Sequence, residues 1–374
     1  MKIDFSIKIP DQHKEYAFLD GIRGIAALYV AVFHAVGILP MDNMTPLILF
    51  IRELTSQGKF AVAVFITLSG FVLALPYAKN GMERWDWNRF IKRRARRIMP
   101  PYYIAAVLSI PWCIVFHYLR HQQLLNYKML LGVFLLQYLD GTWKADVNGP
   151  HWTIGVEFTI YIIFGLLYIR VWKNLGMYAM LGVAILLGFS PLIYCVLMKV
   201  EWYYPWYYPS YFGMFGVGGF TAWICSSKAP KRWLHLWVFG ALILLMVGLK
   251  DEQNKILVMI RKDYFACIYT SLLICFVHAY RSTKIGAVVH GFLVNKYVLF
   301  LGMISYSVYL VHYPFVTTCA FFLKKFSSYN LLYILQCVMA IVLSVGFGYI
   351  FHLFFEKPFL NAAESPKKVD KKEI

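Results

Sequence analysis

The sequence is poor in charge, and acidic residues are its scarcest charged type. Of 374 residues only 15% are charged, with 19 Asp and Glu against 37 Lys and Arg, whereas 60% are apolar. A mean hydropathy of +0.58 is far above that of a soluble protein of this size. What the chain has instead is a series of long apolar runs. We therefore predict an all-α, polytopic integral membrane protein.

Several catalytic and metal-binding signatures are also missing. The seven cysteines stand singly without a CxxC pair, which argues against a disulfide framework or a zinc site. The sequence holds no HExxH or GxSxG motif, so neither a metalloprotease nor a serine hydrolase is supported, and we expect no metal. Repeats and soluble domains are lacking too. We predict one membrane domain over 18–358, between a cytoplasmic segment 1–17 and a basic cytoplasmic tail 359–374.

Ten apolar runs are long enough for membrane helices, which need roughly 20 residues. They lie at 18–38, 59–77, 100–119, 152–172, 176–198, 208–226, 233–249, 264–280, 297–323 and 331–355. An eleventh run, 129–139, is too short to cross comfortably, and we interpret it as an interfacial or re-entrant segment. The first run holds an Arg and a His where a signal peptide has an unbroken apolar core, so we expect a retained span.

The positive charges lie between the apolar runs. A net charge of +18 suggests nucleic-acid binding in a soluble protein, but this distribution follows the positive-inside rule and favours contact with anionic lipids, with no nucleic-acid partner. The segment 78–99 carries eight basic residues, and others lie at 228–232, 281–296 and in the C-terminal tail. Placing these segments inside puts both termini in the cytoplasm, in a multi-pass protein of the cell (inner, or cytoplasmic) membrane.

Two ionisable residues interrupt the first span, in LDGIRGIAALYVAVFHA. Arg23 and His34 are eleven residues apart, so on a helix they share a face at depths about 16 Å apart. Arg23 lies near the cytoplasmic end and can extend to the lipid headgroups, which would make it an anchor. His34 has no such route. It is either a hydrogen-bonded packing residue or a proton-transferring group in a hydrated cavity.

A basic cluster precedes the third span in WNRFIKRRARRIMPPYY, where two prolines follow Lys92, Arg93, Arg94, Arg96 and Arg97. Such charge is typical of a cytoplasmic anchor. Because proline is well tolerated in a first helical turn, we expect the span to begin at Pro100 and Pro101. Guanidinium groups beside a helix N-terminus also suit a phosphate, so a nucleotide-like cytosolic ligand is compatible with this segment.

Polar residues enter two later spans. Glu157, in HWTIGVEFTIY, has hydroxyl side chains one turn to either side, and a carboxylate at such a depth indicates a polar network or a functional role. In LGMISYSVYLVHYPF, Ser305, Tyr309 and His312 follow i, i+4, i+7 spacing and share one face. This stripe either joins helices by hydrogen bonds or lines a cavity.

Small and aromatic residues mark two further features. Ser69 with Gly70, and the run GMFGVGGF at 213–220, predict close helix packing. The segment 201–212, EWYYPWYYPSYF, falls on the outer side in this topology. It is either an aromatic belt at the membrane interface or a stacking surface for a sugar-like acceptor.

Taken in order, these motifs resemble acyltransferase family 3 of integral membrane acyltransferases. The resemblance runs from about residue 18 to 358 and includes VFITLSGFVL and the closing FFEKP, with Glu356 and Pro358. It implies a ten-helix membrane enzyme that moves an acyl group, usually acetyl, from cytosolic acyl-CoA to a hydroxyl, often on a glycan. The implied partners are membrane lipids, acyl-CoA such as acetyl-CoA, and a glycan or lipid-linked sugar acceptor.

The resemblance also implies roles for single residues. His34 is the expected general base on the acceptor hydroxyl or a transient acyl carrier, and Arg23 the group that orients the pantetheine arm of the donor or polarises the thioester carbonyl. Glu157, the third catalytic candidate, is expected to set the His34 tautomer together with His312, or to bind the acceptor. The expected ligands of the CoA phosphates are Arg94 and Arg97, with Arg93 and Arg96 offering the same spacing. The expected substrate-binding residues are Trp152, Ser305, Tyr309 and His312.

One departure from the family pattern bears on how transfer is completed. Many members carry an SGNH-type esterase domain after the membrane part, whereas this sequence ends sixteen residues after EKP. We expect either completion within the membrane domain or a separate acyl-accepting partner. From the residues alone, two other classes stay open: a glycan transporter or flippase, and a proton-coupled carrier using His34 and Glu157. Consumption of acetyl-CoA distinguishes the enzyme from both.

Overall fold

The structure is a computed structural model. It describes residues 15–38, 45–83, 85–119, 131–136, 139, 148–199, 208–226, 239–244, 246–247, 255–323 and 330–364. Over these ranges the chain forms helices joined by turns and contains no strand. The predicted all-α class is confirmed.

Eight helical stretches in this part of the chain are long and apolar enough to cross a membrane. They are Phe18–Gly37, Pro46–Asn80, Trp87–Val115, Gly149–Leu175, Met177–Cys195, Leu257–Tyr280, Lys296–Phe322 and Ile334–Leu360. Eight of the ten predicted spans fall on these stretches. The span predicted at 208–226 appears as helix α9 (Ser210–Ser226), whose 17 residues are mostly buried. The span predicted at 233–249 lies largely outside the described residues.

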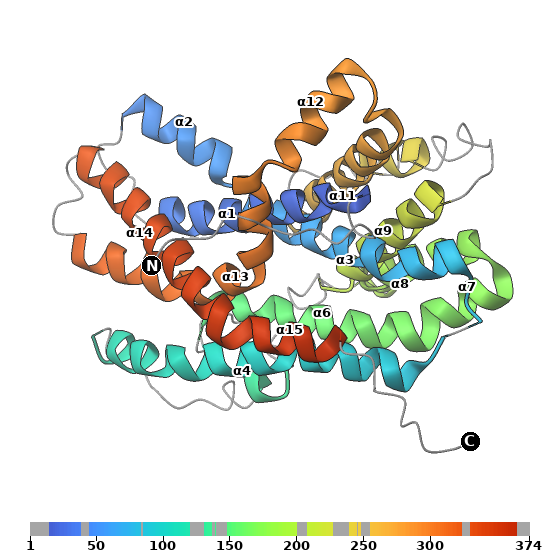
Figure 1. The fold of residues 1–374 in the computed structure, drawn as a ribbon, viewed down its shortest axis with the longest axis horizontal. Helices are drawn as coiled ribbons and strands as arrows, with labels where there is room; N and C mark the ends of the chain where they lie inside the picture. The colour runs from blue at the N-terminus through green and yellow to red at the C-terminus, as the bar shows by residue number, and fades with distance from the viewer. Residues whose placement is uncertain are drawn as a thin grey trace, which may run out of the picture.

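Three helices form the centre of the bundle: α1 (Phe18–Gly37), α3 (Gly58–Asn80) and α13 (Lys296–Leu323). α3 packs against α9, α11 (Lys255–Tyr280) and α1, while α1 packs against α13, and α13 against α14 (Asn330–Phe351). In Figure 1, α4 (Trp87–Leu119), α6 (Trp152–Ile163) and α15 (Lys357–Glu364) run together along the lower side. The remaining labelled helices are α2 (Pro46–Thr55), α7 (Ile169–Leu175), α8 (Met177–Met198) and α12 (Lys284–Leu293).

Glycines allow α3 and α9 to pack at backbone distance. A Cβ atom at Gly70 would lie 2.1 Å from the Phe215 carbonyl oxygen, and one at Gly218 would lie 2.1 Å from the Thr67 carbonyl oxygen. No side chain larger than hydrogen fits at such separations. The close packing predicted from these small residues is confirmed, and it fixes the position of Ser69 next to Gly70.

Helix α4 begins earlier than predicted. It is continuous from Trp87 to Leu119, so Pro100 and Pro101 lie in its interior and not in its first turn. The residues before the prolines are good helix formers, and a membrane helix tolerates proline where neighbouring groups satisfy the freed backbone. At 33 residues the helix is about 50 Å long, well beyond the roughly 30 Å of a hydrocarbon core. The arginines therefore stand on a helical extension of the span.

The short run 129–139 is not a membrane helix in its described part. Residues 131–133 are helical, and the backbone then turns at Leu135, which has a φ of 59°. The Tyr102 hydroxyl donates a 2.9 Å hydrogen bond to the Gly132 carbonyl oxygen and ties the turn to α4. Of the aromatic segment 201–212, residues 208–212 are described. There Tyr208 and Tyr211 are buried against Trp152, with ring centroids 5.0 and 6.1 Å away.

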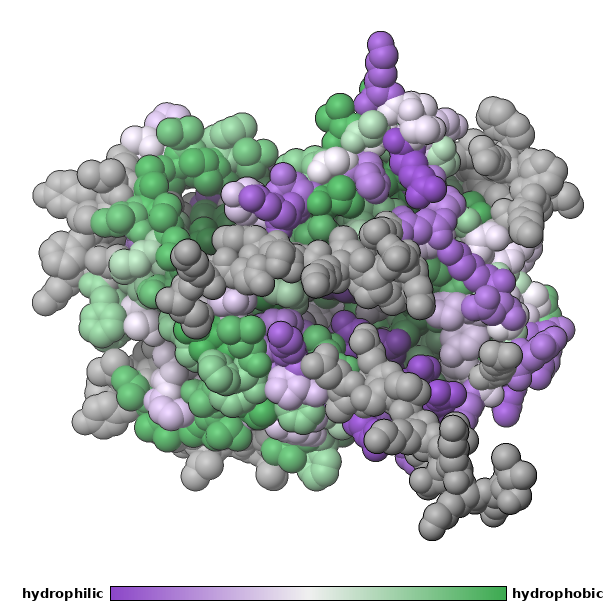
Figure 2. Space-filling model, in the orientation of Figure 1, coloured by the Kyte–Doolittle hydropathy of each residue, from purple (hydrophilic) through white to green (hydrophobic). Residues whose placement is uncertain are grey.

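Charge is unevenly distributed over the surface. In Figure 2, hydrophilic side chains gather toward the right of the view, the end of the bundle where α4 begins, while apolar side chains cover much of the left. The right-hand end holds the basic segment that the positive-inside rule assigns to the cytoplasm.

Candidate active site

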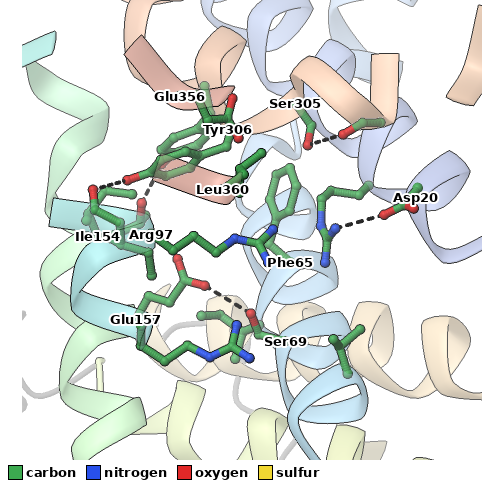
Figure 3. A pocket seen from close by; sticks show the side chains of 18 of the residues that line it. Asp20, Phe65, Ser69, Arg97, Ile154, Glu157, Ser305, Tyr306, Glu356 and Leu360 are labelled. Carbon is green, nitrogen blue, oxygen red and sulfur yellow. Dashed lines mark hydrogen bonds and ion pairs between the residues drawn. The ribbon is translucent and has the colours of Figure 1, made fainter. Parts of the chain in front are cut away.

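A cavity of about 350 Å³ opens between α1, α3, α4, α6, α13 and the π-helical turn η8 (His352–Glu356). We call it the arginine cavity. Figure 3 shows Arg97, Glu157 and Glu356 approaching it from one side and Asp20 from the other. Six residues predicted from the sequence line it together: Arg23, Arg94, Arg97, Glu157, Ser305 and Tyr309.

The helical geometry of α4 decides which arginines reach the cavity. Arg94 and Arg97 are three residues apart, share a face and line it. Arg93 and Arg96, which have the same spacing, are exposed on another face and do not line this cavity. Of the two arginine pairs that the sequence leaves open, only Arg94 and Arg97 line this cavity.

Arg94 is held over two aromatic rings and keeps an unused donor. Its guanidinium carbon lies 5.8 Å from the Phe90 ring centroid and 6.0 Å from that of Tyr161. Its Nε is buried and has no hydrogen-bond partner in the described part of the chain. A buried donor without an acceptor is costly, so the arrangement suits an anion brought by a ligand.

The acidic residues of the cavity have partners of their own. Asp20 accepts a 2.9 Å ion-paired hydrogen bond from Arg23, one helical turn away on α1. The Glu157 carboxylate accepts hydrogen bonds from the Tyr161 hydroxyl and, at 3.0 Å, from the Ser69 hydroxyl. Within the described residues Arg94 and Arg97 form no ion pair, so these acids do not neutralise them directly.

His34 does not line the arginine cavity. It lies, with Phe33, Arg52, Ser56 and Tyr313, on a second cavity of about 400 Å³ between α1, α2 and α13, which we call the histidine cavity. Arg23 and His34 thus share α1, as predicted, but serve two separate cavities about 16 Å apart along the helix axis.

His34 and His312 form a hydrogen-bonded pair whose tautomers follow from their partners. His312 Nδ1 lies 2.8 Å from the Tyr309 carbonyl oxygen, which can only accept, so this nitrogen carries the proton. In the neutral ring Nε2 then accepts, and it lies 3.0 Å from His34 Nδ1. His34 Nδ1 accordingly carries a proton, which is also directed at the Val30 carbonyl oxygen 3.0 Å away. His34 Nε2 is left with a lone pair.

Of the two residues expected to set the His34 tautomer, His312 bonds the His34 ring, whereas Glu157 bonds Ser69 and Tyr161 in the arginine cavity. Tyr309 lines the arginine cavity, and its ring lies 5.8 Å from that of His312, the partner of His34. Its hydroxyl is fixed by the Thr153 hydroxyl at 2.7 Å and by the Pro150 carbonyl oxygen at 2.9 Å. Ser305 donates to the Gly302 carbonyl oxygen. Trp152 is buried against Tyr208 and Tyr211 and lines neither cavity.

Comparison with known proteins now places the chain. A family model described as an acyltransferase domain matches residues 16–353. The chain belongs to acyltransferase family 3.

Relatives of this acyltransferase family 3 protein are distant. It is 26% identical over 339 residues to a candidate peptidoglycan O-acetyltransferase of Bacillus subtilis (strain 168), covering 82% of this chain and 49% of that protein. It is 27% identical over 164 residues to an O-acetyl transferase of Shigella phage Sf6, covering 41% and 46%. A candidate acetyltransferase of Acidianus two-tailed virus is 25% identical over 297 residues, covering 78% and 80%. The chain spans about half the length of the first two relatives. No solved structure matches it.

Two residues of this candidate site were not predicted from the sequence, Asp20 and His352. Asp20 was not singled out because Arg23, its partner one turn away, was considered without it. His352 stands four residues before Glu356, a spacing that places both on one helical face and that a search for paired ionisable residues would have found. Both line the arginine cavity. Within the described ranges no group of three His, Cys, Asp or Glu side chains is arranged to hold a metal ion.

Proposed function

We propose that this family 3 protein is a membrane O-acyltransferase that moves an acyl group, acetyl in the simplest case, from cytosolic acyl-CoA to a hydroxyl of a surface glycan. The observation that carries the proposal is the buried Nε of Arg94, which has no hydrogen-bond partner among the described residues and lies in one cavity with Arg23 and Arg97. Acyl-CoA is a thioester that carries several phosphates. Guanidinium forks match phosphate oxygens in charge and geometry.

In this proposal the arginine cavity holds the donor. Arg94 and Arg97 bind its phosphates at the end of the cavity where the basic extension of α4 begins. Arg23 belongs to the same cavity and is about 16 Å from His34 along α1, which supports its role in orienting the donor rather than polarising a carbonyl next to His34. The pantetheine arm, which is long and flexible, then leads the thioester toward Tyr309 and the histidine pair.

The histidine pair supplies the base. His34 Nε2 takes the proton of the acceptor hydroxyl, and the hydroxyl oxygen attacks the thioester carbonyl. The carbon–sulfur bond breaks, the new ester bond forms, and the proton passes to the leaving sulfur to give free CoA. His312 acts through His34: by accepting from Nδ1–H, it keeps the His34 lone pair on Nε2.

The acceptor is proposed from the relatives and from the second cavity. One relative is named for peptidoglycan, a surface glycan rich in hydroxyl groups. The histidine cavity contains Arg52, Thr55 and Ser56 beside His34, polar groups of the kind that bind a sugar. Mass spectrometry of envelope glycans from cells with and without the gene is expected to show the loss of one acetyl group per modified residue.

Transfer from labelled acetyl-CoA by the purified protein tests the donor. Arg94→Gln is expected to raise KM for acetyl-CoA by roughly tenfold or more, because a charge-assisted hydrogen bond contributes about 1.5–3 kcal/mol. Arg93→Gln is the matched control: it removes the neighbouring, exposed guanidinium and should leave KM near the wild-type value. A wild-type protein that neither binds CoA nor consumes acetyl-CoA would contradict the proposal and favour a carrier.

A further inference from the structure

A second carboxylate–imidazole pair lies in the arginine cavity, apart from the groups used above. His352 Nδ1 lies 2.8 Å from Glu356 Oε2, and the Ser307 hydroxyl donates to the same oxygen at 2.5 Å. Both side chains of the pair are 4% exposed. They stand four residues apart on the π-helical turn η8, where α14 passes into α15. Such turns interrupt α-helices often at functional positions.

The partners fix the tautomer of His352. A carboxylate only accepts hydrogen bonds, so Nδ1 carries the proton and, in the neutral ring, Nε2 presents a lone pair. Glu356 is the one hydrogen-bond partner of His352 within the described residues. Because His352 lines the arginine cavity, Nε2 is available to accept a hydrogen bond from a ligand there.

The level of the His352–Glu356 pair along α13 indicates which part of a bound acyl-CoA would lie next to it. Along α13 the cavity lining begins at Leu299 and includes Gly302, against which the Asp20 backbone packs, and Tyr309, whose ring lies near His312. Gly302 and Tyr309 are about 10 Å apart along the axis, and Ser307 lies between them. The neighbouring Tyr306 hydroxyl bonds the Ile98 carbonyl oxygen, directly after Arg97. The pair held by Ser307 therefore stands between the level of Asp20 and Arg23 and that of the histidine pair, close to Arg97.

A packing role does not explain the arrangement. Burying an ionisable pair costs desolvation free energy that a hydrophobic pair of the same size avoids, and such pairs are weak evidence for stability. The carboxylate instead orients the ring, as in catalytic and metal sites where a second group sets the imidazole tautomer. In this structure the oriented group is His352 Nε2, an acceptor without a partner among the described residues, in the lining of the arginine cavity.

We propose that His352, positioned by Glu356 and Ser307, binds the pantetheine arm of acyl-CoA by accepting a hydrogen bond at Nε2 from one of its amide N–H groups or its hydroxyl. The inference rests on the proposed function and adds a contact that recognises the arm instead of the phosphates. Its role is to hold the arm on the line from Arg94 and Arg97 to the histidine pair.

Calorimetric titration of the full-length protein in lipid nanodiscs tests the contact between His352 and the pantetheine arm. It uses two ligands and two variants, each of which replaces one nitrogen of the His352 ring. The ligands are CoA and its adenosine bisphosphate end, which keeps phosphates and lacks the arm. In His352→Asn the side-chain amide replaces Nδ1 and bonds Glu356, but nothing replaces Nε2. In His352→Gln the amide reaches the position of Nε2. We expect His352→Asn to bind CoA roughly fivefold to tenfold more weakly and the adenosine fragment unchanged. His352→Gln keeps an acceptor near the position of Nε2 but loses the bond to Glu356, so it should bind CoA more tightly than His352→Asn and less tightly than the wild type.

The outcomes separate this contact from the proposed function. Arg94→Gln should weaken both ligands, and if the wild type binds neither, the proposed function itself is wrong. If the wild type binds both and His352→Asn weakens neither, or weakens both equally, the contact with the arm is overturned. A measurement on the wild type alone gives a second test. CoA, and not the adenosine fragment, should protect His352 from diethyl pyrocarbonate, read by peptide mass spectrometry. Equal protection by both ligands, or none, overturns the inference.

Discussion

The histidine pair shows how a hydrogen bond between two helices can orient a residue that looks isolated in the sequence. His34 stands alone in an apolar run, and only the fold brings His312 to within 3.0 Å of it from another span. Together with the Val30 carbonyl oxygen, His312 holds the proton of His34 on Nδ1 and leaves the lone pair on Nε2.

Replacing His312 tests this relation. His312→Leu removes the side-chain acceptor that holds the His34 ring and leaves the Val30 carbonyl oxygen as the other acceptor of Nδ1–H. We expect the less well oriented ring to lower kcat about tenfold to hundredfold, since positioned acid–base catalysis contributes in that range or above. KM for acyl-CoA should change little because His312 does not line the arginine cavity. His312→Gln, whose amide oxygen can accept in place of Nε2, should recover part of kcat. A KM for acyl-CoA that rises by as large a factor as kcat falls, or a kcat that does not recover in His312→Gln, would indicate that His312 has only a structural role.

For single residues, the sequence predicted which side chains belong to the candidate site better than it predicted their hydrogen-bond partners. Arg94 and Glu157 stood out because charge in an apolar run is costly wherever it lies. Ser69 did not stand out as a partner of Glu157, since hydroxyl side chains are common in helices and its bond crosses from α3 to α6. Trp152 was expected at the site but packs in the core, because an aromatic ring gives no sign of which side it faces.

At the scale of elements, apolar length predicted the helices and failed at their ends. The run 100–119 was visible as a span, but α4 continues back to Trp87. Hydropathy cannot register a basic, soluble helical extension, and proline was interpreted as a start signal although a membrane helix can contain it. Close contact between α3 and α9 was predictable, because small residues in a membrane helix allow the backbones of two helices to approach closely.

A substitution at the contact between α3 and α9 measures its contribution. Gly70→Ala places a Cβ 2.1 Å from the Phe215 carbonyl oxygen, so the helices must separate, and we expect a loss of about 1–3 kcal/mol in stability. The matched control is Gly182→Ala on α8, where an added Cβ would have no described residue outside its own helix turn within 4 Å. Thermal unfolding in detergent should show a lower Tm for the first variant only. Equal Tm values would mean that the contact relaxes without cost.

At the scale of the whole molecule, the two cavities lie at different levels along α1. The arginine cavity adjoins the basic end of the bundle and the histidine cavity lies toward the other end of α1. Under the proposed function, a phosphate-bearing donor and a glycan acceptor would approach from opposite sides, and only the acyl group would have to pass between them. The sequence predicted the polar residues of both cavities but not this division, because residues of one helix face looked like a single continuous site.

Helix α3 allows the two-sided arrangement to be tested. Its 23 residues extend about 34 Å, enough to cross the roughly 30 Å hydrocarbon core, so Ser56 before it and Asn80 at its end must lie on opposite sides. Ser56 borders the histidine cavity, and both residues are exposed. In intact cells a membrane-impermeant maleimide should label the Ser56→Cys variant, and the Asn80→Cys variant only after the membrane is opened, with the wild type giving the background from native cysteines. If Asn80→Cys is labelled in intact cells and Ser56→Cys only after the membrane is opened, the basic end lies outside, and cytosolic acyl-CoA cannot reach the arginine cavity. Labelling of both variants from one side would mean that α3 does not span, and acceptor and donor would then have to share an entrance.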